Sequence, residues 1–149
     1  MRAIVQRVSR AGVEIDGQAV GRIGEGLLVY VGIGRDDGPT DLEYVSNKIL
    51  GLRVFADQVG KMNLDVAQIG GAVLVVSNFT LFGNARKGRR PAFTEAAEPA
   101  MANEMYEGLC AKLREAGLEV QMGRFGAKMA VQATNDGPIN ILLDSKRGF

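Results

Sequence analysis

The sequence predicts a single α/β domain over residues 1–149, built from a mixed β-sheet and two main helices. Two short and continuously apolar segments, 27–33 and 72–76, have the length and composition of buried strands. Two longer segments, 40–52 and 99–113, repeat their apolar residues with helical spacing. The chain has 149 residues, of which 46% are hydrophobic and 23% charged, so it is long enough to bury a substantial core.

The first part of the chain predicts strands followed by a helix. Residues 3–9 are expected to form the first strand, and 27–33 a strand covered on both faces. Asp16-Gly17 suits a tight turn and is expected to join Val13–Ile15 to the residues after Gln18 as a hairpin. The segment Thr40-Asp41-Leu42-Glu43 has the spacing of a capping box and is expected to open the first helix. The apolar face of that helix consists of Leu42, Val45, Ile49 and Leu52.

The second part predicts a buried strand, a second helix and three further strands. The strand over 72–76 ends abruptly in the polar step Ser77-Asn78. Pro99 is expected to start the second helix, and Gly117 to end it. The apolar face of this helix consists of Ala102, Met105, Leu109 and Leu113. The remaining strands are expected over 118–122, 128–134 and 139–143.

Two absences narrow the chemistry. The chain has no histidine, which excludes Ser-His, Cys-His and His-metal mechanisms. Its single cysteine, Cys110, excludes an internal disulfide and a Cys-only zinc site, and its apolar helical setting favours inert packing. The chain has 18 Lys and Arg against 17 Asp and Glu, a net charge of +1. A charge so close to zero does not indicate that the chain as a whole binds nucleic acid. We expect neither a metal nor another cofactor.

The sequence also predicts a cytoplasmic protein without a membrane partner. No apolar run approaches the ~18 residues that a membrane span needs. The first residues include charged side chains and contain no long apolar stretch, unlike the apolar region of a secretory signal.

The first candidate site is the segment Ser77-Asn78-Phe79-Thr80-Leu81, directly after the most apolar strand. Ligands of open α/β sheets bind beyond the carboxyl ends of such strands. The segment offers two hydroxyls, one amide and a run of backbone N–H groups. An ordinary strand end with local turn hydrogen bonds is the alternative, and composition alone favours it.

Each of two further segments can be interpreted either as a functional site or as an ordinary loop or turn. Four positive charges lie within five residues, at Arg86, Lys87, Arg89 and Arg90. Beside a pocket they can bind phosphates, although most such runs are solvated loops. The segment Asn135 to Asn140, with Gly137-Pro138 inside it, is typical of a plain turn between strands. The Gly32-Ile33-Gly34 sequence lacks the context of a dinucleotide site.

Seven short motifs are spread over nearly the whole chain. When they occur together at matching positions, they identify a family. They are Gln6-Arg7-Val8, Lys61-Met62-Asn63, Leu74 to Leu81, Gly88-Arg89-Arg90-Pro91, Gly123-Arg124-Phe125-Gly126-Ala127, Asn135-Asp136-Gly137-Pro138 and Leu143-Asp144-Ser145. By these motifs the chain resembles the D-aminoacyl-tRNA deacylases. The family has two signature loops, Ser-Gln-Phe-Thr and Asn-x-Gly-Pro-x-Thr. Here Asn78 replaces the glutamine, with one methylene less, and Asn140 replaces the threonine of the second loop.

The resemblance implies hydrolysis of the ester that joins a D-amino acid, or glycine, to the 3′-terminal adenosine of tRNA. It implies a homodimer in which a cis Gly137–Pro138 peptide enters the partner's pocket. There its carbonyls hold the substrate amino group and leave no room for an L side chain. Arg7 is similar to the residue that braces this loop, and Phe125 and Met129 resemble pocket-lining positions. The implied substrate-binding and chiral-selection set is Gly137, Pro138, Asn135, Asn140, Phe125, Met129 and Arg7.

The absence of histidine bears on the mechanism. A Ser77 or Thr80 nucleophile has no evident activating base, so we favour attack by water assisted by the 2′-hydroxyl of the adenosine. Backbone N–H groups around Phe79 and Thr80 are then expected to stabilise the oxyanion. One rival interpretation is an acyl-enzyme hydrolase that uses Thr80 or Ser77 as its nucleophile. Another is a non-catalytic module that binds tRNA 3′ ends, in which the Asn78 and Asn140 changes have disabled catalysis. The third is a purely structural homodimer.

Overall fold

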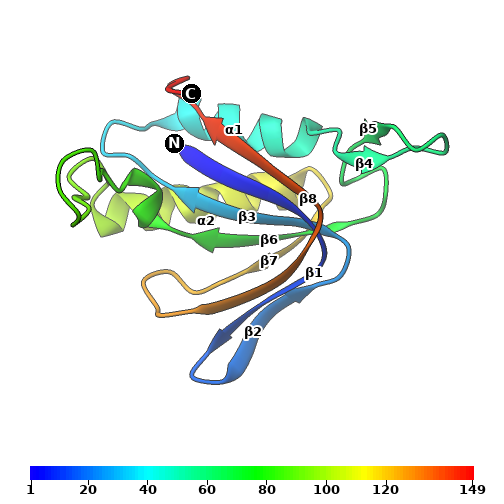
Figure 1. Ribbon diagram of the computed structural model, residues 1–149, viewed down its shortest axis with the longest axis horizontal. Helices are drawn as coiled ribbons and strands as arrows, with labels where there is room; N and C mark the ends of the chain where they lie inside the picture. The colour runs from blue at the N-terminus through cyan, green and yellow to red at the C-terminus, as the bar shows by residue number, and fades with distance from the viewer.

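The computed structural model describes residues 1–149, and it shows one curved β-sheet with two helices on one face (Figure 1). The sheet strands are β1 (Arg2–Ile15), β2 (Gln18–Ile23), β3 (Gly26–Gly32), β6 (Ala72–Ser77), β7 (Glu119–Met122) and β8 (Ala130–Asp144). The helices are α1 (Pro39–Gly51), α2 (Pro99–Glu115) and the short 3-10 helix η1 (Phe79–Phe82). A small separate hairpin consists of β4 (Phe55–Ala56) and β5 (Met62–Leu64). The predicted α/β fold with a mixed sheet and two main helices is confirmed.

The sheet has the strand order β2-β1-β3-β6-β7, and β8 lies outside this order and pairs with β1. Strand β1 is antiparallel to β2, β3 and β8, whereas β3, β6 and β7 are parallel to one another. Parallel pairing brings the carboxyl ends of β3 and β6 to the same edge of the sheet, where Val31 lies beside Ser77. The first candidate site therefore begins at this edge.

The central strands are buried on both faces, as their continuous apolar sequence predicts. Leu27, Val29 and Val31 of β3 face the main core with α1 and α2. Leu28 and Leu74, on the opposite face, pack in a second cluster that the β1–β2 hairpin completes. These five side chains are fully buried, so the sheet forms a rigid support for its loops.

Cys110 on α2 belongs to the main core, and burial raises the pKa of its thiol to about 11. A thiol with this pKa is protonated near neutral pH and is a poor nucleophile. The expected inert packing of Cys110 is confirmed. No helix of the structure is both long and apolar enough to cross a membrane.

The long strands β1 and β8 differ from the prediction of shorter, separate strands. β1 is continuous because β8 pairs with it along nearly its whole length. β8 is also continuous, although Asn135 pairs with Val8 and Asn140 pairs with Gln6. Residues 136–139 consequently have no partner on β1 and bulge out of the ladder. The ordinary interpretation of 135–140 as a plain turn does not hold, because both ends of the segment stay in the sheet.

The two main helices begin at prolines, and only one of these starts was predicted. α1 begins at Pro39 with Gly38 as N-cap, and the Asp41 carboxylate accepts the Gly38 N–H at 2.8 Å. The capping box expected from Thr40 is therefore wrong: proline fits the first helical position because its missing N–H is not needed there. α2 begins at Pro99 and ends before Gly117, whose φ is +91°, as predicted.

Candidate active site

A cleft of about 610 Å³ opens at the carboxyl end of β6. Its walls come from the ends of β3 and β6, the start of η1, the segment 93–99, the first turns of α2 and the loop 123–129. The predicted site residues that line it are Ser77, Asn78, Phe79, Phe125 and Met129. Nine of the 14 lining residues are hydrophobic, and both the size and the lining suit a small-molecule site.

The glycines of Gly32-Ile33-Gly34 let η1 approach β3 closely. A Cβ on Gly32 would lie 2.9 Å from the Asn78 carbonyl oxygen, and one on Gly34 would lie 2.9 Å from the Phe82 ring. Arg2 fixes η1 from the other side, since its Nη1 donates to the Leu81 carbonyl at 3.0 Å and its guanidinium lies 4.6 Å from the centre of the Phe82 ring. The two glycines thus have a packing role.

Asn78 caps η1 with its side chain. Its Oδ1 accepts the Thr80 N–H at 3.2 Å and also accepts the Thr80 hydroxyl proton. The Thr80 N–H, which we expected to face an oxyanion, is therefore already engaged. Thr80 itself is exposed and is not among the residues that line the cleft.

The apolar part of the cleft is aromatic. The rings of Phe79 and Phe93 meet edge to face, with centroids 5.0 Å apart. On the opposite wall, Phe125 packs near Tyr106, with centroids 6.2 Å apart. The buried Tyr106 hydroxyl donates to the Val75 carbonyl at 2.9 Å, and burial raises the pKa of Tyr106. Tyr106 therefore ties α2 to β6 directly behind the site.

The cleft wall has almost no ionisable side chains. Glu98, the N-cap of α2, is the one ionisable side chain in its wall. No hydrogen bond links the hydroxyl of Ser77 or Thr80 to a lysine or a carboxylate. No group of three or more metal-ligating side chains gathers anywhere in the chain. What the cleft offers a substrate is the backbone N–H of Phe79, the hydroxyl of Ser77 and the amide of Asn78.

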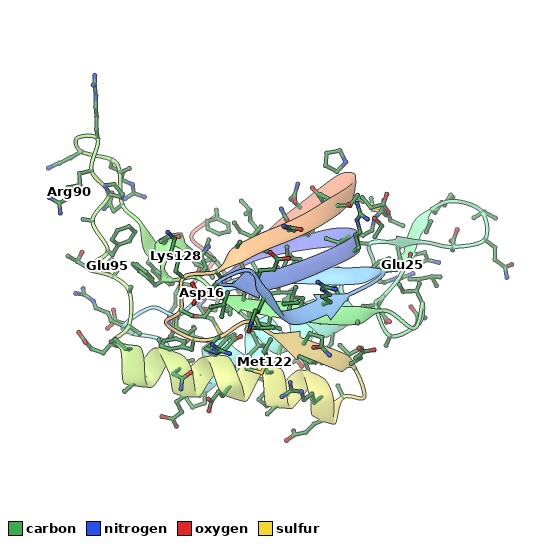
Figure 2. All side chains as sticks on the ribbon, turned by 90° about the horizontal axis from the view of Figure 1, so that it is seen from below. Asp16, Glu25, Arg90, Glu95, Met122 and Lys128 are labelled. Carbon is green, nitrogen blue, oxygen red and sulfur yellow. The ribbon has the colours of Figure 1, made fainter.

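A basic arm, residues 84–92, borders the cleft. Asn84 and Ala92 pair through two backbone hydrogen bonds of 2.8 and 2.9 Å, and Phe93, the next residue, lines the cleft. The four basic residues of the arm are all exposed, and none forms an ion pair with a carboxylate: Arg86, Lys87, Arg89 and Arg90. Figure 2 shows Arg90 on a loop that projects from the body of the protein, with Glu95 near its base.

The remaining predicted site residues lie around the bulge of β8, which we call the 136–139 loop. Arg7 donates to the Asp136 carbonyl at 3.2 Å, pairs with its carboxylate at 3.1 Å and donates to the Val54 carbonyl at 2.7 Å. Asn135 Nδ2 donates to the carbonyls of Arg7 and Ile139 at 2.9 and 3.1 Å. Arg7 and Asn135 thus brace the loop within its own chain, while their part in substrate binding stays a prediction.

The 136–139 loop is separate from the cleft of the same chain. Its Gly137–Pro138 peptide is cis, and Gly137, Pro138 and Asn140 are exposed. The bend of β8 lies at the end of the sheet opposite to the arrowhead of β6 (Figure 1). The structure therefore gathers the predicted residues into two groups at opposite ends of the sheet.

Sequence reasoning missed part of the cleft wall. Phe93, Ala97 and Glu98 lie in the irregular segment between the basic arm and α2. This segment has no periodic pattern that marks a buried face. The one available signal is that Pro99 fixes the start of α2, which places the residues before it at the amino end of a helix.

Comparison with known proteins identifies the class of enzyme. The chain is 58% identical to the D-aminoacyl-tRNA deacylase of Anaeromyxobacter dehalogenans and 54% identical to that of Thermotoga petrophila, in both cases over 149 residues and 100% of each chain. These relatives place it among the hydrolases that act on ester bonds. The profile of the D-Tyr-tRNA(Tyr) deacylase family matches residues 4–144, and the chain belongs to this family.

Solved structures share the whole fold. The c-Myc DNA Unwinding Element Binding Protein superposes with a TM-score of 0.91 at 39% identity, over 97% of this chain and 98% of its own. A structure described as that of a probable eukaryotic D-amino acid tRNA deacylase gives a TM-score of 0.82 at 19% identity, over 95% and 97% of the two chains, and shares the fold. The family profile and the two relatives confirm the family resemblance, while the roles of individual site residues stay predictions.

Proposed function

We propose that the protein hydrolyses the ester between a D-amino acid or glycine and the 3′-terminal adenosine of tRNA, and rejects L-aminoacyl-tRNA. The observation that carries this proposal is the cleft at the end of β6, with aromatic walls, the backbone N–H of Phe79 and a basic arm at its rim. An aminoacyl-tRNA substrate is consistent with a cytoplasmic site of action.

The substrate supplies the chemistry that the cleft lacks. Water, assisted by the vicinal 2′-hydroxyl, adds to the ester carbonyl carbon. The tetrahedral intermediate then collapses and the 3′-oxygen leaves with a proton. The N–H of Phe79, at the first position of η1, faces no partner within its own helix and is available to the oxyanion. The Phe79 and Phe93 rings offer faces for the adenine base.

Chiral selection requires a second chain in this proposal. The cleft and the 136–139 loop of one chain lie at opposite ends of its sheet (Figure 1), whereas a two-fold dimer can place each loop over the partner's cleft. The loop carbonyls then accept hydrogen bonds from the substrate ammonium group. An L side chain points into the loop backbone and is rejected by steric clash.

The direct test follows ester loss from matched D-, L- and glycyl-tRNA under single-turnover conditions. We expect rapid hydrolysis of the D and glycyl esters and background hydrolysis of the L ester. Rapid L hydrolysis contradicts chiral selection. Tight tRNA binding without turnover supports the binding module, and an acylated protein trapped by acid quench supports Thr80 or Ser77 as a nucleophile.

The basic arm gives a second prediction. Arg90→Ala should weaken tRNA binding and lower the slope of log Kd against log salt by about 0.7, because one phosphate contact is lost. Lys48→Ala on α1, which removes an exposed charge away from the cleft, is the control and should leave the slope unchanged. Filter binding of uncharged tRNA at several salt concentrations measures both. An unchanged slope for Arg90→Ala excludes the arm as a phosphate contact.

A further inference from the structure

A second cavity, of about 190 Å³, lies at the base of the basic arm and shares no lining residue with the cleft. Phe82 and Gly83, at the end of η1, line this cavity, whereas Asn78 and Phe79, at its start, line the cleft. A 3-10 helix rises by about 2.0 Å per residue, so the two ends of η1 are about 6 Å apart. The cavity is therefore a separate site that adjoins the cleft.

Two arginines bring positive charge to the cavity, Arg2 and Arg86. Arg2 Nη1 donates to the Leu81 carbonyl at 3.0 Å, and its Nε is buried without a hydrogen bond, 3.7 Å from the Asp144 carboxylate. The Arg2 side chain is nevertheless 36% exposed, and its Nη2 forms no hydrogen bond in the chain. The Arg86 side chain forms neither a hydrogen bond nor an ion pair. Both guanidinium groups therefore keep N–H donors for a ligand.

The turn that follows η1 adds two more donors. Asn84 Oδ1 accepts the Arg86 N–H at 3.0 Å, which leaves the Asn84 NH2 group free. The N–H of Ala85 forms no hydrogen bond, and both residues line the cavity. Guanidinium, amide and backbone N–H groups are the donors with which proteins bind the phosphates of nucleic acids.

One carboxylate opposes this positive charge. Glu95 lines the cavity, and Figure 2 shows it near the base of the loop that carries Arg90. Arg35 pairs with the Glu95 carboxylate at 3.3 Å and partly neutralises it. Because a single paired carboxylate faces two arginines, the cavity suits an anion and not a cation.

We propose that the cavity binds a phosphodiester group of the single-stranded 3′ end of tRNA, which rests on the proposed function. Its volume has room for about six waters, and so for a phosphate group. With the terminal adenosine in the cleft, a phosphate of the last nucleotides lies within reach, because the two sites are separated only by η1. This phosphate accepts hydrogen bonds from Arg2, Arg86 and the Ala85 N–H. Arg2 thereby gains a role in substrate binding that no sequence motif indicated.

Two D-aminoacyl esters that differ in phosphate content test the proposal. One is the ester of adenosine, which has no phosphate, and the other is the ester of the trinucleotide CCA, which has internucleotide phosphates. We define the phosphate preference as kcat/KM for the trinucleotide ester divided by kcat/KM for the adenosine ester. Any loss that a variant suffers through η1 or through stability affects both esters and cancels in this ratio.

Arg86→Met should lower the phosphate preference about tenfold, as expected for the loss of one hydrogen bond to a charged group. Arg2→Met should lower it by a similar factor, although it also releases the Leu81 carbonyl. Glu95→Gln removes the opposing charge and should raise the preference by about threefold.

Arg114→Met is the matched control. Arg114 Nη2 also donates to a backbone carbonyl, that of Val120, at 3.0 Å, but Arg114 lies on the last turn of α2 and outside the cavity. This variant should keep the wild-type phosphate preference.

The outcomes separate the proposal from a purely structural role. Equal losses with both esters in Arg2→Met show that Arg2 only supports η1, and an unchanged preference in Arg86→Met shows that no phosphate occupies the cavity; either result overturns the proposal. If the wild-type protein hydrolyses neither ester, the proposed function itself fails. If it hydrolyses both with no phosphate preference, only the present inference fails.

Discussion

Gly137→Ala should lower kcat/KM for D-aminoacyl-tRNA by about 10²-fold, because a displacement of about 1 Å at a positioning group has effects of this size. Gly137 has a φ of +128°, and a Cβ there would lie 2.8 Å from Ile139 Cγ1 and 2.9 Å from the Ile139 N. The 136–139 loop must therefore move to admit the methyl group. A displaced loop no longer positions the ammonium group, nor does it exclude an L side chain, so the ratio of D to L hydrolysis should fall as well.

Gly70→Ala is the matched control for this variant. Gly70 also has a positive φ, +65°, but a Cβ there has no atom within 4 Å. Both variants place an alanine at a positive φ, which destabilises the folded protein, but only Gly137→Ala alters the 136–139 loop. Single-turnover rates with D and L esters, together with melting temperatures, compare them. Wild-type turnover and selectivity in a folded Gly137→Ala protein would refute the role assigned to the loop.

The elements that the sequence predicted are those whose signal is local. The apolar run 27–33 and the helical spacing of Leu109 and Leu113 require no knowledge of distant residues. The bulge of β8 is different, because it exists only through the pairing of Asn135 with Val8 and Asn140 with Gln6. Partners so far apart along the chain leave no periodic trace in either segment.

The candidate site divides in the same way. Ser77, Asn78 and Phe79 were found because the end of a buried strand is a general place for ligands. The contact between Asn78 and Thr80 depends on side-chain conformations that no spacing rule specifies. Local sequence patterns did not predict the separation of the cleft from the 136–139 loop, and only the family resemblance implied that the loop enters a partner's pocket. The separation follows from the course of β8 along β1, and it is the reason why the proposed function includes a second chain.

Mixed dimers test that proposal most directly. Ala127 lines the cleft, so Ala127→Trp should block it, and Gly137→Ala disables the loop. Each variant alone is expected to be inactive. In a one-to-one co-expression, half of the dimers combine the two chains, and each of these contains one unblocked cleft facing one intact loop. Activity should therefore return to about a quarter of the wild-type value if the site is shared between subunits.

The double variant Ala127→Trp/Gly137→Ala, co-expressed with the wild-type chain, provides the converse measurement. If cleft and loop come from different subunits, every mixed dimer is inactive and about a quarter of the activity remains, from wild-type dimers alone. If each chain carries its own complete site, about half remains, and the two single variants do not complement each other. Initial rates of D-aminoacyl-tRNA hydrolysis at equal protein concentration distinguish these results. Activity that returns when the two single variants are co-expressed, together with a quarter of the activity when the double variant is co-expressed with the wild type, can arise only when one chain's loop completes the other chain's cleft.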